Sequence, residues 1–155
     1  MKIEQANINR LLSMYIPKHR YLTEFEHTFP TTTGTFKIPN PDYTSLNIHY
    51  FTAIEAQYCL NQLGYASLWA SLTNKNIPDF PELDFRKIQQ GKTLAYIQEQ
   101  DITFRQMIST QTPIEGTLVF QGWFPGKKYH KVICNFDFEE MSCYGRLKIA
   151  IGPLE

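Results

Sequence analysis

The sequence predicts an α+β protein in which one long apolar helix is wrapped by a curled antiparallel sheet. The first observation is that residues 53–72 are apolar on nearly every side, as expected of a helix at the centre of a protein. The second is that residues 93–151 are rich in strand-forming side chains and contain a hairpin signal. An antiparallel sheet normally buries one face, and this helix is apolar enough to cover it.

The N-terminal third of the chain predicts one helix and two strands. Apolar residues at helical spacing indicate a helix over residues 3–15, and Pro17 prevents it from continuing. Alternating aromatic and polar residues indicate a half-buried strand over residues 21–29. A second, short strand is expected to begin after Gly34 and to stop at Pro39.

The long helix has a clear start signal. Thr52 is followed three residues later by Glu55, which is the pattern of a capping box. In that motif the threonine hydroxyl accepts a hydrogen bond from the Glu55 amide, and the Glu55 carboxylate reaches back to the cap. We therefore expect the helix to begin at Ala53 and to end near Leu72.

The second half of the chain predicts a short helix and then mainly strands. The short helix is expected near residues 80–90, followed by a long strand over residues 93–108. Residues 122–132 indicate a hairpin turn between two further strands, and residues 141–151 indicate the last strand. One central helix and four or more antiparallel strands are the outline of the hot-dog fold.

Composition limits the class of protein. With 155 residues, 43% hydrophobic and 14% aromatic, residues 1–155 are predicted to form a single domain with one core. Fifteen basic and fifteen acidic residues balance, so no overall field attracts nucleic acid or a membrane surface. No uninterrupted apolar run reaches the roughly 20 residues needed to cross a bilayer, so membrane insertion is not expected.

The cysteines and the N-terminus indicate the cytoplasm. The three cysteines are odd in number and lack the spacing of a metal site, and the start, "MKIEQANINR", is too polar for a signal peptide. They are Cys59, Cys134 and Cys143. The sequence contains no metal-ligand cluster, glycine-rich phosphate loop or nucleophile elbow, so no metal and no cofactor are expected.

Three amides interrupt the apolar helix and suggest where function lies. An unpaired buried polar group costs roughly 1–3 kcal/mol, so each amide must either bond to its surroundings or face a pocket. We expect Asn61 to face a pocket, because nothing in helix propensity favours it there. We expect Gln57 and Gln62 to anchor the helix.

The helix carries a resemblance to a known family. The stretch "TAIEAQYCLNQLGY" resembles the long-chain fatty-acyl-CoA thioesterases of the FcoT type, a branch of the hot-dog superfamily. The resemblance extends upstream to "YIPKHRYL" and "PDYTSLNIH", and downstream to "ITFRQMI" and "GRLKIAI". It implies an acyl-CoA or acyl carrier protein substrate and an assembly that is a homodimer or a trimer of dimers.

The resemblance also implies an uncharged active site of two tyrosines and two asparagines. Carried over by position, the tyrosines fall on Tyr15 and Tyr43, and the second asparagine falls on Asn61. The first asparagine meets Thr52, which is a departure from the family pattern. These four residues are the predicted catalytic set.

The residues alone leave other interpretations open. Tyr15 can be the last apolar anchor of the first helix, and Tyr43 can be a surface residue. Thr52 can be only a cap, and Asn61 can be a core amide whose hydrogen bonds are satisfied. Nine residues at about 100° each place Thr52 and Asn61 on opposite sides of the helix, roughly 13 Å apart along it. If both serve one site, the site must combine residues from two subunits.

Weaker candidates lie outside the helix. His49 precedes it and is a candidate substrate-binding residue or general base. Lys127 and Lys128 lie in the predicted hairpin turn and are candidates for binding the phosphates of CoA or an acidic carrier protein, although an ordinary solvated turn would look the same.

The sequence thus predicts a thioester hydrolase in which water attacks the acyl group directly. Two alternatives stay open. One is a hydratase, dehydratase or lyase acting on unsaturated acyl thioesters. The other is a hot-dog domain that binds an acyl thioester without chemistry, with Thr52 marking the loss of activity.

Overall fold

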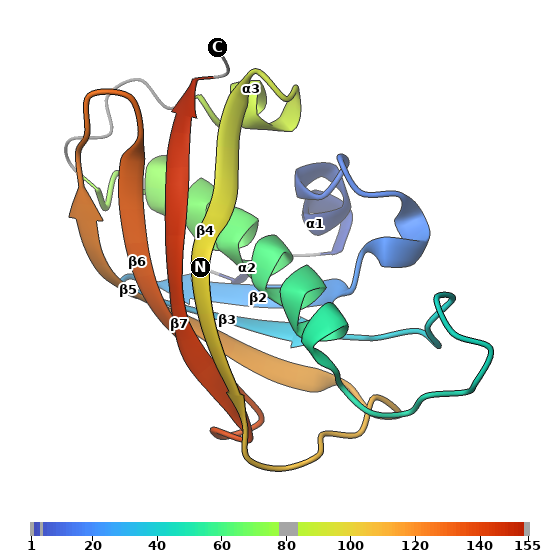
Figure 1. The fold of residues 1–155 in the computed structure, drawn as a ribbon. Coiled ribbons are helices and arrows are strands. Elements are labelled where there is room, and N and C mark those ends of the chain that lie inside the picture. The colour runs from blue at the N-terminus through green and yellow to red at the C-terminus, as the bar shows by residue number, and fades with distance from the viewer. Residues whose placement is uncertain (1, 4, 78–83, 154–155) are drawn as a thin grey trace.

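The sheet of this protein curls around its longest helix, α2 (Figure 1). The structure is a computed structural model that describes residues 2–3, 5–77 and 84–153. The elements in chain order are β1 Lys2–Ile3, α1 Gln5–Leu11, the short 3-10 helix Pro17–His19, β2 Leu22–Thr28, β3 Thr31–Phe36, α2 Ala53–Thr73, α3 Phe85–Gln89, β4 Thr93–Phe104, β5 Ile114–Phe124, β6 His130–Phe138 and β7 Cys143–Pro153.

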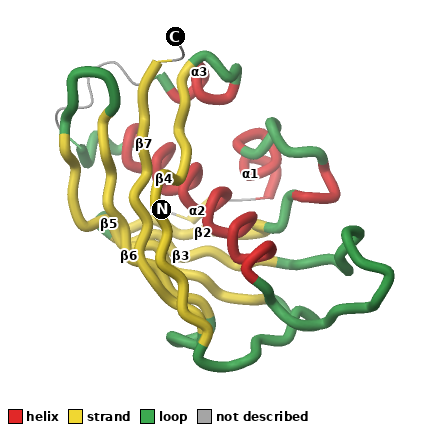
Figure 2. The backbone as a smooth tube through the Cα atoms, viewed as in Figure 1, coloured by secondary structure: helices red, strands yellow, loops and turns green. Residues whose placement is uncertain are grey.

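The seven strands form one sheet in the order β1-β2-β3-β5-β6-β7-β4, and every neighbouring pair is antiparallel. Figure 2 shows the strands following one another around a single concave surface, with α1 and α3 on the same side of the sheet as α2. The predicted hairpin is confirmed, since β5 and β6 pair along their length. β4 is twelve residues long and pairs only with β7, so its other edge is free among the described residues.

α2 fills the concave surface of the sheet and forms the core. Its predicted capping box is confirmed, because both reciprocal bonds between Thr52 and Glu55 are present. Gly34 of β3 leaves room for the side chains packed between the sheet and α2, since a Cβ there would lie 2.7 Å from Leu22 Cδ1 and 2.8 Å from Leu63 Cδ1. Cys59 is fully buried and acts as a small core residue, as predicted.

Some predicted bounds were wrong. The first helix ends at Leu11 rather than near residue 15, and a turn follows in which the Tyr15 N–H donates to the Leu12 carbonyl at 2.9 Å. β3 starts at Thr31 instead of after Gly34, because Gly34 pairs with Gly116 of β5 and does not interrupt the ladder. The short helix expected over residues 80–90 is observed as α3, Phe85–Gln89. Residues 80–83 of that prediction lie outside the residues that the structure describes.

Candidate active site

The first turn of α2 is organised around the buried carboxylate of Glu55. The Thr52 backbone N–H donates to Glu55 Oε2 at 2.9 Å, and the Thr52 hydroxyl donates to the same oxygen. The Tyr43 hydroxyl donates to Oε1. Because Glu55 is only 3% exposed, these three donors and the positive end of the helix stabilise its charge.

Two predicted site residues, Tyr43 and Thr52, are therefore bound to Glu55. Burial of its hydroxyl, and then the hydrogen bond to Glu55, raise the pKa of Tyr43 above its usual value, so it stays protonated at neutral pH. The Thr52 hydroxyl also accepts from the Ile54 N–H at 3.2 Å. Each hydroxyl carries one proton, so neither can donate to a substrate while it donates to Glu55.

The other two predicted residues line a groove on a different face of α2. Tyr15, Ala53, Ile54, Gln57, Tyr58 and Asn61 line it, and we call it the helix groove. Its volume of about 380 Å³ lies within the usual range of ligand sites. Ala53, the first residue of α2, also lines this groove, and its N–H has no hydrogen-bond acceptor among the described residues.

Tyr15 contributes a hydroxyl that resists ionisation. Burial is the main reason that the pKa of Tyr15 lies well above its usual value, and the nearby Tyr65 and Tyr58 add to the effect. The Tyr15 and Tyr65 rings meet edge to face with centroids 6.4 Å apart. The Tyr15 carbonyl accepts from Arg20 Nε at 2.8 Å, which holds the backbone at this point.

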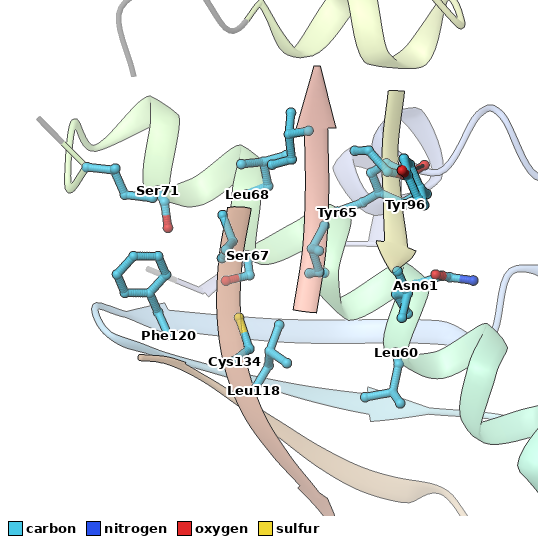
Figure 3. A pocket seen from close by; sticks show the side chains of 17 residues that line it. Leu60, Asn61, Tyr65, Ser67, Leu68, Ser71, Tyr96, Leu118, Phe120 and Cys134 are labelled. Carbon is cyan, nitrogen blue, oxygen red and sulfur yellow. Dashed lines mark hydrogen bonds between the residues drawn. The ribbon is translucent and has the colours of Figure 1, made fainter. Parts of the chain in front are cut away.

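Asn61 lies where the helix groove meets a second, apolar cavity. This cavity lies between α2 and strands β4 to β7, and Asn61 lines both spaces. Figure 3 shows the Asn61 amide directed away from Phe120 and Cys134 on the apolar wall. The cavity holds about 50 Å³, well below the usual size of a ligand site.

The three amides of α2 divide into two roles. Gln62 is an anchor, as predicted: its Oε1 accepts from the Tyr21 and Leu22 N–H groups at 2.9 and 3.0 Å, and its Nε2 donates to the His19 carbonyl at 2.6 Å. The prediction that Gln57 anchors the helix was wrong. Gln57 lines the helix groove, and its side chain has no hydrogen-bond partner in the described part of the chain.

Helical spacing explains the result for Gln57. Residues four apart on a helix lie on the same face, so Gln57 shares the face of Asn61, whereas Gln62 points about 100° away from it. The same geometry separates the four predicted catalytic residues into pairs: Tyr15 with Asn61 in the helix groove, and Tyr43 with Thr52 on Glu55.

The three predicted substrate-binding residues lie outside the helix groove. His49 is exposed in the loop before α2, and its backbone carbonyl accepts from the Thr110 N–H at 2.9 Å. Lys127 and Lys128 are exposed in the β5–β6 hairpin, which lies toward the C-terminal end of α2 (Figure 1). Within one subunit the hairpin is thus remote from the start of the helix.

Comparison with known proteins identifies the family. The sequence matches the model of the FcoT-like thioesterase domain over residues 10–151. The chain belongs to this family. The match includes all four predicted catalytic residues of this FcoT-like chain, although it assigns no role to any of them. No curated protein matches the sequence.

Solved structures show that the FcoT-like chain has the hot-dog fold. A mutant thioesterase from Pseudomonas aeruginosa aligns with a TM-score of 0.59 at 13% identity, covering 98% of this chain and 96% of that one. A hypothetical thioesterase from Streptococcus pneumoniae, solved with coenzyme A, gives a TM-score of 0.52 at 10% identity over 96% and 99% of the two chains. The CurJ dehydratase gives 0.56 at 12% identity, over 99% of this chain and 48% of that chain.

The described residues of the FcoT-like chain show no metal site and no membrane-spanning helix. Residues 2–3, 5–77 and 84–153 contain no group of three or more histidine, cysteine, aspartate or glutamate side chains that could hold a metal ion. No helix in the same residues is long and apolar enough to span a membrane.

Sequence reasoning missed two features of this site. Glu55 was assigned to capping, and nothing in the sequence indicated that Tyr43 would bind the same carboxylate, because the contact depends on how the loop folds back. Tyr58 was not singled out, although it lies three residues before Asn61 and helical spacing could have placed it beside the groove.

Proposed function

We propose that this protein hydrolyses fatty acyl thioesters of CoA or of an acyl carrier protein by direct attack of water. The observation that carries the proposal is the position of Asn61, whose polar side chain lies at the junction between the helix groove and an apolar cavity. A fatty acyl thioester bound across this junction would place its polar thioester at Asn61 and its hydrocarbon chain in the apolar cavity.

The residues of the helix groove supply the groups that hydrolysis needs. As water oxygen bonds to the carbonyl carbon, negative charge grows on the carbonyl oxygen, and it is stabilised by donors already in place. Tyr15 and the Ala53 N–H are such donors. The Asn61 side-chain oxygen accepts a hydrogen bond from the attacking water and so orients it. The carbon–sulfur bond then breaks, and the thiol leaves with a proton that derives from the water.

The acyl chain is assigned to the apolar cavity, with its direction toward the C-terminal end of α2. The residues of α2 that line this cavity run from Leu60 and Asn61 to Ser71, which gives the direction. A volume of about 50 Å³ is too small for a long chain, so binding requires lining side chains to move or a second subunit to widen the space.

We also propose that the protein is at least a homodimer. The uncovered edge of β4 supports this, because a long free edge strand is a template for pairing with another strand. An assembly could bring Tyr43 and Thr52 of one subunit near the helix groove of another. Sedimentation velocity at micromolar concentration tests it, and a monomer would contradict a shared site.

The cytoplasm is the proposed location. Cys59, Cys134 and Cys143 are all free and buried, as expected of a protein kept in a reducing compartment.

The experiment is thiol release from acyl-CoA substrates over a panel of chain lengths. We expect turnover with the wild type, and a loss of about 10²-fold in kcat for Asn61→Ala, the scale of removing one positioned transition-state group. Asn135→Ala, an exposed asparagine on β6, is the matched control and should keep full activity. If Asn61→Ala turns over normally but unfolds at lower urea, Asn61 is structural.

The same assay decides between the alternatives. A change in enoyl absorbance without thiol release would indicate a hydratase or dehydratase. The CurJ dehydratase has a similar fold, so the fold is compatible with that reaction. Saturable binding of acyl-CoA without turnover would indicate a binding domain, in keeping with a Thr52 hydroxyl that is already used by Glu55.

A further inference from the structure

A second groove adjoins the helix groove at the start of α2. It lies between residues 18–21 on one side and residues 39–43 on the other, and Ile54 and Tyr58 form part of its lining. We call it the loop groove; its volume is about 400 Å³. Ile54 and Tyr58 also line the helix groove, so the two hollows are neighbours on one face of the helix.

Three hollows therefore follow one another along α2. The loop groove meets the helix groove at Ile54 and Tyr58, and the helix groove meets the apolar cavity at Asn61. With the acyl chain directed into the apolar cavity and the thioester at Asn61, whatever is attached to the sulfur must leave in the direction of the loop groove. This step rests on the proposed function.

The walls of the loop groove are flat and largely apolar. The His19 and Tyr58 rings stack with centroids 5.2 Å apart and 13° between their planes. Tyr21 packs against Tyr58 at 5.3 Å, and Pro39 and Pro41 lie on the opposite wall. Such walls suit a narrow chain of amides and methyl groups better than a compact, strongly charged ligand.

The charged groups lie at the rim of this groove. Lys18 forms an ion pair with Asp42, and both side chains are more than half exposed, at 61% and 56%. The pair is weak at this exposure, so an arriving anion can take Lys18 from Asp42 at little cost. The hydrogen bond to Lys18 lowers the pKa of Asp42, which is therefore ionised at neutral pH and competes with any such anion.

We propose that the loop groove binds the phosphopantetheine arm that CoA and acyl carrier proteins share, and that Lys18 binds its phosphate in exchange for Asp42. The aromatic and proline walls contact the pantetheine part. The arm then lies on the opposite side of the thioester from the acyl chain.

Two charge changes of opposite sign test the proposal. Lys18→Gln should raise KM for acyl-CoA about threefold to fivefold at low salt, the scale of one exposed ion pair, and the effect should shrink as salt is added. Asp42→Asn removes the competing carboxylate and should lower KM. If the ion pair served only to hold the loop, both variants would raise KM. Lys131→Gln, an exposed lysine on β6, is the control for loss of one positive charge.

A substrate series separates this proposal from the hydrolase itself. One acyl group is attached in turn to N-acetylcysteamine, pantetheine, 4′-phosphopantetheine, CoA and a carrier protein. The Lys18→Gln effect should be absent for the first two and present for the phosphorylated forms. If Lys18→Gln has the same effect with 4′-phosphopantetheine as with CoA, Lys18 binds the phosphate attached to the pantetheine arm. An effect with CoA alone would overturn that assignment.

Two other results would overturn the proposal. Lys18→Gln could leave KM unchanged for every substrate while the double variant Lys127→Gln/Lys128→Gln raises it for CoA, which would place the phosphate on the hairpin of a partner. Hydrolysis of every ester in the series, with no effect of Lys18→Gln on KM for any phosphorylated form, would refute the loop-groove proposal and leave the hydrolase intact. No hydrolysis of any ester would remove the proposed function instead.

Discussion

Thr52 is the residue at which capping and chemistry can be separated most sharply. Replacing it with valine keeps the β-branched shape and removes the hydroxyl. The hydroxyl makes two contacts, accepting from the Ile54 N–H at 3.2 Å and donating to the buried Glu55 carboxylate. Both are lost in Thr52→Val.

The magnitude follows from these contacts. Loss of an N-cap acceptor costs about 1 kcal/mol. Loss of one donor to a carboxylate adds about 1 kcal/mol, at the low end of the usual range because Tyr43 and the Thr52 N–H still donate to Glu55. The total of about 2 kcal/mol corresponds to a fall in Tm of roughly 4–8 °C for a chain of this size.

Urea unfolding followed by circular dichroism measures this change as a lower midpoint at an unchanged slope. Thr52→Ser keeps both contacts and serves as the control. Thr52→Asn also keeps an acceptor and a donor at the cap, so its stability should stay within about 0.5 kcal/mol of the wild type.

Two results would refute this reasoning. A cost below about 0.5 kcal/mol for Thr52→Val would mean that the bond to Glu55 contributes nothing in solution. A Thr52→Asn protein of normal stability but higher turnover would mean that this position takes part in hydrolysis, as the family pattern implies, and is more than a cap.

The remaining predictions concern Gln62 and the buried tyrosines. Gln62→Leu leaves the Tyr21 and Leu22 N–H groups without an acceptor and should lower the free energy of unfolding by about 2–4 kcal/mol, measured by urea unfolding. Gln57→Leu is the control and should lower it by less than about 0.5 kcal/mol. Equal costs would contradict the assigned roles. Burial raises the pKa of Tyr15 above its usual value, so the unfolded chain ionises first and stability should fall as pH rises past about 10. The free energy of unfolding measured at about pH 8 and at about pH 10.5 checks this. If the loss of stability between the two is as large in Tyr15→Phe as in the wild type, other groups cause it.

How far the sequence predicts the site depends on whether a residue's position follows from local geometry. The capping box and the separation of Asn61 from Thr52 follow from helical spacing alone, so both could be stated in advance. The same spacing would have placed Gln57 beside Asn61, but its chemistry alone suggested an anchor. For β3, glycine was treated as a boundary, and pairing with Gly116 across the sheet removed that boundary.

The sequence by itself determined the long helix, its start at Thr52 and the class of sheet around it, because hydrophobic pattern and capping act over a few residues. Tertiary structure decided what surrounds each polar group. The Tyr43–Glu55 bond, the Lys18–Asp42 pair and the junction of groove and cavity at Asn61 each join segments that are distant in sequence. Such contacts depend on how loops close over the helix, and no local pattern encodes that closure.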